Sequence, residues 1–183
     1  AVGPESIENV EVIVKILHRH QFASFLYLIP LIEYQKEVVA KAPSSLFVLL
    51  YRRMMMRLAQ RVMYREGGKA LVTGESLSQV ASQTLDNLHV VDVLAKRPVF
   101  RPLIGMNKEE IIQWAERIGT ARISEQPYEE CCSLYASRSP ALSAKLEEIE
   151  AAEALLDVAG FEEKLWSARE VRKFFSGPKP NVD

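Results

Sequence analysis

The sequence lacks the features that mark several common classes of protein. Only two of its 183 residues are cysteines, Cys131 and Cys132, and adjacent cysteines rarely bridge each other, which excludes a disulfide framework. No apolar run approaches the roughly eighteen residues that span a bilayer, and no secretory signal is visible. We therefore expect a cytoplasmic protein with no membrane partner.

Charge and chemically reactive residues are equally limited. A net charge of −1 gives no global attraction for a polyanion, so any nucleic-acid site has to be local. The three histidines are scattered without metal-ligand spacing, and neither a Ser-His-Asp order nor a Walker A glycine loop is present. With 48% hydrophobic residues, the composition is that of an ordinary core-forming domain.

Strand-like and helix-like segments alternate along the chain. Apolar runs at 22–31, 69–73 and 98–103 predict buried strands. Helical periodicity and capping signals predict helices over 6–21, 33–41, 43–65, 76–89, 107–119 and 140–158, and the sequence SARE at 167–170 predicts a last short helix. This order favours an α/β fold, a parallel sheet with helices on both faces, whose ligands bind beyond the carboxyl ends of the strands.

The segment LVTGESLSQVASQT, residues 71–84, joins an expected strand to an expected polar helix. Gly74 lets backbone approach a ligand without a Cβ, and Gln79 and Gln83 would lie one turn apart. The alternative is a helix start with a solvated polar face.

The segment YRRMMMRLAQRVMYR, residues 51–65, carries arginines every fourth residue. Arg53, Arg57 and Arg61 form a stripe with Arg52 beside it. Such a stripe suits phosphate contacts to nucleic acid, and a solvated helix face remains the alternative. The interleaved methionines are typical of a core.

Cys131 and Cys132 lie in the expected loop PYEECCSLY, residues 127–135. A cysteine acts as nucleophile or sulfur carrier only as thiolate, and Glu129 and Glu130 would raise its pKa. Reactive and inert cysteines both remain open at this point.

Four blocks together resemble a known family. The blocks YRRMMMRLAQR, LVTGESLSQVASQTLDNL, VFRPLIGMNKEEIIQWAERIGT and PYEECC resemble the tRNA sulfurtransferases that make 4-thiouridine and often serve thiamine thiazole synthesis. The resemblance covers roughly residues 45–140, and 6–42 more loosely. It implies a PP-loop ATP pyrophosphatase domain of the adenine-nucleotide α hydrolase (HUP) type. In this family ATP adenylates the uridine oxygen, and sulfur then displaces AMP.

The resemblance also implies site residues and partners. Nucleotide contacts fall on Arg52, Gly74 and Gln83, and the sulfur-carrying cysteine falls on Cys131, with Cys132 adjacent. The implied cofactors are ATP and Mg²⁺. The implied partners are tRNA and a sulfur donor such as a cysteine desulfurase or a rhodanese-type carrier.

The sequence departs from the family pattern in four ways. An SGGxDS pyrophosphate loop, an N-terminal tRNA-binding region and a rhodanese-like domain are absent from these 183 residues, and Ser78 stands where glycine is common. We therefore expect an N-terminally incomplete PP-loop domain over 1–140, with 141–183 as its helical extension and tail.

Such a chain should bind ATP poorly and be inactive alone, and the exposed edge of its sheet would favour a homodimer. The alternative is a non-catalytic nucleotide- or RNA-binding remnant, or a subunit of a split enzyme.

Overall fold

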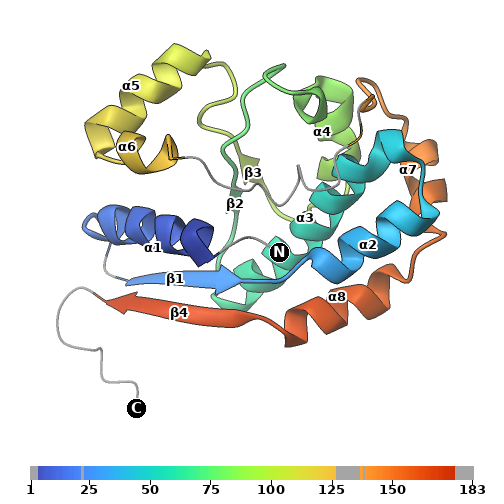
Figure 1. Ribbon diagram of the computed structural model, residues 1–183, viewed down its shortest axis with the longest axis horizontal. Coiled ribbons are helices and arrows are strands. Elements are labelled where there is room, and N and C mark those ends of the chain that lie inside the picture. Colours follow the sequence, from blue (N-terminus) through green and yellow to red (C-terminus); the bar gives the residue numbers. More distant parts are fainter. Residues whose placement is uncertain (1–3, 22, 127–136, 138, 176–183) are drawn as a thin grey trace.

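The computed structural model describes residues 4–21, 23–126, 137 and 139–175 (Figure 1). Helices and strands alternate over most of this length, which confirms the α/β class. No helix in the described part is both long and apolar enough to cross a bilayer. The elements in chain order are α1 (Pro4–His18), β1 (Ala23–Leu28), α2 (Ile32–Lys41), η1 (Ser44–Leu46), α3 (Phe47–Arg65), β2 (Leu71–Val72), η2 (Ala81–Gln83), α4 (Leu85–Asp92), β3 (Val99–Phe100), α5 (Lys108–Ile118), α6 (Ala121–Ser124), α7 (Leu146–Glu153), α8 (Val158–Ser167) and β4 (Glu170–Phe175).

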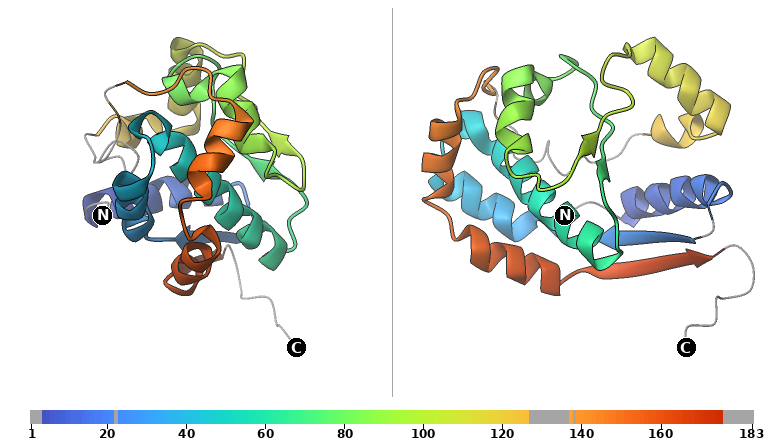
Figure 2. Two further views of the ribbon diagram at one scale, coloured as in Figure 1. Left: turned by 90° about the vertical axis from the view of Figure 1, so that its right-hand side faces the viewer. Right: turned by 180° about the vertical axis from the view of Figure 1, so that it is seen from behind.

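The strands form two separate pairs. β2 and β3 are parallel, with Leu71 opposite Val99, as the α/β pattern predicted. β1 is antiparallel to β4, with Ala23 opposite Phe175. In Figure 1 the β1–β4 pair lies along the lower edge and β2 runs steeply across it, and the view from behind in Figure 2 shows the same separation.

The strand β4 corrects the prediction of a short helix after Ser167. Ser167 is the last residue of α8, and residues 170–175 are extended. Their sequence EVRKFF is rich in branched and aromatic residues, which favour strands when a partner edge is available. β1 supplies that edge, and Phe25 packs edge-to-face on Phe175 with ring centroids 6.1 Å apart.

Two predicted helices have different bounds. The helix expected over 76–89 is instead a loop, the short 3-10 helix η2, and then α4, whose first turn is capped by Thr84 through a 3.3 Å hydrogen bond from the Asn87 backbone N–H. The helix expected over 140–158 begins only at Leu146 and ends at Glu153. A second helix, α8, starts after Asp157, whose carboxylate accepts the Gly160 N–H at 3.0 Å.

Helix α3 lies at the centre of the molecule, with α2, α4, α7 and α8 around it (Figure 1). Many of its apolar side chains are buried, including Leu50, Met54 and Leu58, and three of its four methionines are among them, as the predicted core role of this segment requires. Tyr34 of α2 and Ile149 of α7 complete this core. Because this core holds α3 in place, polar side chains of α3 that face the strand ends are held in place as well.

Helix α5 confirms the local signals at both of its ends. The Asn107 side chain accepts the Glu110 backbone N–H at 3.0 Å, and the Glu110 carboxylate accepts the Asn107 N–H at 2.8 Å. This is the predicted capping box. Gly119 ends the helix with a φ of 82°, a left-handed conformation that glycine adopts without strain.

Candidate functional site

A cavity of about 400 Å³ lies at the carboxyl end of β2, between that strand, α3 and η2. Its walls are largely apolar, with a few polar groups from the strand end and from η2. The lining residues are Val48, Arg52, Met55, Met56, Ala59, Leu71, Val72, Thr73, Gly74, Glu75, Ser82, Gln83 and Val91. The structure thus brings together Arg52, Gly74 and Gln83, the three residues for which nucleotide contacts were predicted.

Gly74 follows β2, where the chain leaves the parallel pair. The Thr73 N–H still donates to the Phe100 carbonyl oxygen at 3.0 Å, so the backbone is held up to that point. A Cβ placed on Gly74 would meet no atom of the described residues within 4 Å. The packing of the described residues therefore does not demand glycine here, and among these residues the space beside Gly74 is open to a ligand.

Gln83 closes the loop that follows Gly74. Its side-chain oxygen accepts the Ser76 backbone N–H at 3.2 Å, and its carbonyl oxygen accepts the Ser78 N–H at 3.0 Å. The Ser76 hydroxyl donates to the Met106 carbonyl oxygen at 2.7 Å and fastens the loop to the segment after β3. The hydroxyls and amides read as a polar helix face thus hold a loop together, which is why the helix prediction for this segment is wrong.

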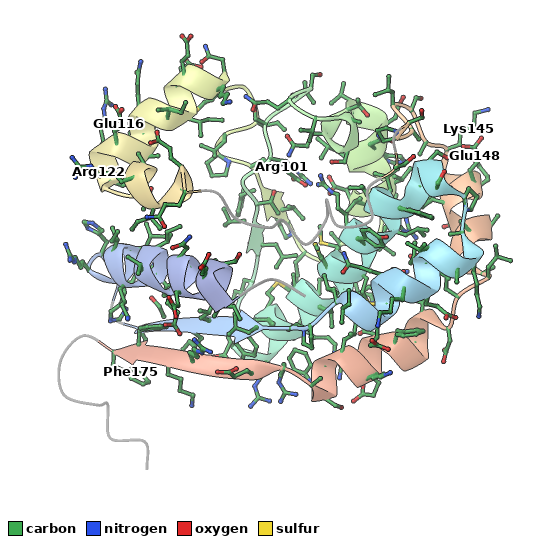
Figure 3. The ribbon with its side chains drawn as sticks, in the orientation of Figure 1. Arg101, Glu116, Arg122, Lys145, Glu148 and Phe175 are labelled. Carbon is green, nitrogen blue, oxygen red and sulfur yellow. The ribbon has the colours of Figure 1, made fainter. Side chains whose placement is uncertain are left out.

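Four charged side chains form a row that begins at the wall of the cavity and continues behind it. The Glu75 carboxylate pairs with Arg52 and with Arg101, whose Nε lies 2.5 Å from Glu75 Oε2. Arg101 also pairs with Asp92 at 2.5 Å, and the Thr73 hydroxyl donates to Glu75 at 2.7 Å. Figure 3 shows Arg101 near the centre of the molecule rather than on its rim.

Sequence reasoning did not identify Glu75 or Asp92 as site residues. The sequence did contain a signal for them, because arginines that are buried near a strand end need carboxylate partners. The Arg52 and Arg101 side chains are only 15% and 13% exposed, and Glu75 follows Gly74 directly. The pairing itself depends on how α3 packs against the ends of β2 and β3. Local sequence patterns do not specify that packing.

The arginine stripe of α3 faces other helices. Arg53 is 2% exposed, and its Nη2 lies 2.8 Å from Glu153 Oε2. Arg57 reaches the same carboxylate at 2.7 Å. Arg61 lies 2.8 Å from Glu163 and 4.7 Å above the Trp166 ring. The three arginines therefore join α3 to α7 and α8, and a role in nucleic-acid binding stays a prediction.

The Glu153 carboxylate is held ionised inside this contact. Burial alone would raise its pKa, but hydrogen bonds from Arg57 and Arg53 outweigh that effect and keep the pKa below its usual range. A carboxylate that stabilises two guanidinium groups in the interior is a structural element of the α3–α7 contact.

Cys131 and Cys132 lie outside the described residues, so their predicted roles as sulfur carrier and neighbour stay predictions. No group of three or more His, Cys, Asp or Glu side chains in the described ranges could hold a metal ion. Glu75, the carboxylate that lines the cavity, is already engaged by two arginines. Mg²⁺ therefore stays a prediction.

A cavity beyond the carboxyl ends of parallel strands places the chain among α/β proteins of the ligand-binding type. The chain belongs to the family described as "Thiamine biosynthesis protein (ThiI)", which matches residues 1–158. The family resemblance expected from the four sequence blocks is thereby confirmed.

Relatives in several bacteria are similar to the chain. It is 48% identical to a "Probable tRNA sulfurtransferase" of Thermus thermophilus over 151 residues, which cover 82% of this chain and 37% of the relative. For proteins of the same description, identity is 42% over 154 residues in Caldanaerobacter subterraneus and 44% over 147 residues in Treponema pallidum. These matches cover 84% and 80% of this chain, and 40% and 37% of the relatives. The chain thus spans well under half the length of these relatives.

A solved structure shares the fold. It is described as "Crystal structure of a 4-thiouridine synthetase - RNA complex with bound ATP", and it is 34% identical with a TM-score of 0.89. The match covers 94% of this chain and 45% of the other. The expected fold type is therefore confirmed over nearly the whole chain.

Proposed function

We propose that this chain is the part of an ATP-dependent tRNA sulfurtransferase that surrounds the nucleotide, in an enzyme that converts a tRNA uridine to 4-thiouridine. The observation that carries the proposal is the shared cavity of Arg52, Gly74 and Gln83 at the end of β2. It is supported by relatives described as tRNA sulfurtransferases and by the ATP and RNA bound in the similar structure.

The residues of the cavity fit an adenine nucleotide in chemical type. Apolar side chains of α3 and β2, among them Met55 and Val72, suit the faces of a base. The open space at Gly74 admits a ligand close to backbone, and Gln83 and Arg52 supply polar groups for its edge. ATP, when bound, supplies the adenylyl group that turns the uridine oxygen into a leaving group.

Sulfur delivery is assigned to the cysteine loop. The terminal sulfur of a persulfide on Cys131 would attack the activated uridine carbon as AMP departs, leaving that sulfur joined to Cys131 through a disulfide bond. A thiol reductant would then attack the Cys131 sulfur, break this bond and release the 4-thiouridine. A cysteine desulfurase or a rhodanese-type carrier would load that sulfur. The same sulfur could be passed to thiamine thiazole synthesis, a use supported by the description of the family.

The proposed partners follow from the same reaction. The tRNA is the substrate, and Arg61, the most exposed arginine of the predicted stripe, is the residue proposed to contact it, because Glu153 already holds Arg53 and Arg57 inside the α3–α7 contact. A cytoplasmic homodimer is proposed as the working form. It is supported by the exposure of Phe100, 57%, on β3, since exposed apolar surface favours association.

The test measures 4-thiouridine in tRNA from a bacterial host that lacks its own synthetase and carries a full-length tRNA sulfurtransferase in which this chain replaces the matching segment. We expect the hybrid to restore 4-thiouridine, whereas this chain alone should give none. Gly74→Val in the hybrid should abolish it, because the added side chain enters the ligand space, where a Cβ would meet no described residue within 4 Å. The matched control is Gly105→Val, at a glycine whose Cβ position is equally unobstructed and that lies outside the cavity lining, and it should keep activity. A folded hybrid that makes no 4-thiouridine would favour the non-catalytic binding alternative.

A further inference from the structure

The described lining of the cavity contains one cation and one anion, and they are paired with each other. Among the described residues that line it, only Arg52 and Glu75 carry charge. Glu75 is 8% exposed, and its Oε1 contacts Arg52. Arg52 also donates to the Ser82 hydroxyl and carbonyl oxygens at 3.3 Å each, so its guanidinium is held against η2. The positive charge at the cavity wall is thus neutralised before any ligand enters.

The carboxylate of Glu75 is fixed from behind as well. Its Oε2 accepts from Arg101 at 2.5 Å and from Thr73 at 2.7 Å. Arg101 does not line the cavity, and its far end pairs with Asp92 at 2.5 Å. The four charges alternate in sign from Asp92 through Arg101 and Glu75 to Arg52, and they sum to zero. A carboxylate with three such donors is costly to displace, because its release would break its ion pairs with both arginines.

This arrangement has a consequence for the part of a nucleotide that the cavity accepts. A phosphate placed here would lie beside a fixed carboxylate and gain little from an arginine that the carboxylate already neutralises. A base and ribose carry no charge and suit the apolar walls, with Ser82 and Gln83 as neutral hydrogen-bonding groups. Resting on the proposed function, we propose that this cavity is the nucleoside subsite and that Glu75 is its specificity-determining residue, withholding Arg52 from phosphate.

The test compares adenosine with AMP in NMR titrations of the 183-residue chain without Mg²⁺. Wild-type chain should bind the two within about threefold of each other, because the wall is neutral. Glu75→Gln keeps the size of the side chain and an acceptor for Thr73 but leaves the cluster positive. The ratio of the adenosine and AMP dissociation constants should therefore shift about tenfold in favour of AMP. The matched control is Asp92→Asn, which removes the same charge away from the cavity and should leave the ratio as in wild type.

The ratio of the two dissociation constants separates an effect on specificity from an effect on folding, because a loosened cavity would weaken the binding of adenosine and AMP alike. An unchanged ratio in Glu75→Gln, or a wild-type chain that prefers AMP by tenfold or more, overturns the inference and leaves the nucleotide site standing. A wild-type chain that binds neither ligand overturns the site itself. Should Glu75→Gln not fold, Arg52→Gln tests the same point: the wall becomes negative, and AMP should weaken several-fold relative to adenosine. An unmoved ratio there also overturns the inference.

Discussion

Arg57 and Glu153 meet through two hydrogen bonds, with Nη1 2.7 Å from Oε1 and Nη2 2.9 Å from Oε2, and Arg53 reaches Oε2 of the same carboxylate at 2.8 Å. Glu153 is 8% exposed and Arg53 only 2%. A bidentate pair reinforced by a second arginine connects the central helix α3 to α7, although the partners are far apart in the sequence.

Replacing Glu153 by glutamine should destabilise the chain by roughly 3–5 kcal/mol, because it leaves a buried guanidinium without its counter-ion. Urea unfolding measures this directly. Glu162→Gln is the control: Glu162 lies 3.6 Å from Arg61 at a more exposed contact, and its loss should cost less than about 1 kcal/mol. Equal losses in the two variants would contradict a structural role for the Arg53–Arg57–Glu153 cluster.

The same cluster predicts how stability depends on pH. The folded pKa of Glu153 lies below its ordinary value of 4.5, so the ionised carboxylate contributes stability at neutral pH. That contribution should disappear as the pH falls through the lowered pKa. Unfolding free energies measured from pH 7 downward should therefore drop more steeply for the wild-type chain than for Glu153→Gln. Parallel curves would show that the pair does not contribute.

Ser78 has a φ of 60°, and it is the one described non-glycine residue with a positive φ. This is the position where the family resemblance leads us to expect glycine. Ser78→Gly should raise the unfolding free energy by about 0.5–1 kcal/mol, because glycine adopts this conformation without a Cβ clash. Ser45→Gly in η1, where φ is not positive, should lower it by a similar amount. A destabilised Ser78→Gly would mean that the serine side chain is needed in the loop.

Arg61 offers the cleanest test of the proposed tRNA contact, because it is the most exposed of the three arginines at 30% of its side chain. Arg61→Gln should weaken tRNA binding and lower the slope of log K against log salt by about one. Lys36→Gln on α2 removes the same charge from a different helix and should leave the slope unchanged. If Arg61→Gln also leaves it unchanged, Arg61 serves only the contact with α8.

Local signals predicted the elements that depend on neighbouring residues. The capping box at Asn107 and the end of α5 at Gly119 were found because their partners lie within one turn. β4 was missed because its stability comes from β1, at the other end of the chain. The loop after Gly74 was read as a helix because its polar residues have helical spacing, whereas Ser76 and Met106 hold it through tertiary hydrogen bonds.

The candidate site shows the same division. Arg52, Gly74 and Gln83 were identified from long sequence blocks, and the fold brings all three to one cavity. Glu75 was missed although it adjoins Gly74, because its importance depends on two arginines that arrive from α3 and from the end of β3. The sequence blocks thus identify residues that line the site. The ion pairs that balance their charges can be identified only from the three-dimensional arrangement of the helices and strands.

A cation is needed to stabilise a thiolate at Cys131, because Glu129 and Glu130 precede it. Arg101 and Arg122 are the two arginines that we consider for this role. Arg101 is engaged by Glu75 and Asp92. Arg122 lies exposed on α6, at the outer edge of the molecule (Figure 3). Arg122→Gln should therefore raise the pKa of the reactive thiol, measured as a shift of its alkylation rate to higher pH.

Cys131, rather than Cys132, is expected to carry the transferred sulfur. The spacing from the VASQT block through RPLIG to PYEECC matches the family without a gap at Cys131. Glu129 and Glu130 disfavour an easily formed thiolate, so the residue must be held reactive by a nearby cation for persulfide chemistry to proceed. In the complete enzyme Cys131→Ser should abolish 4-thiouridine formation while ATP binding persists, and Cys132→Ser should retain substantial activity. Normal thiolation by Cys131→Ser would instead assign the sulfur to Cys132 or to an external sulfide.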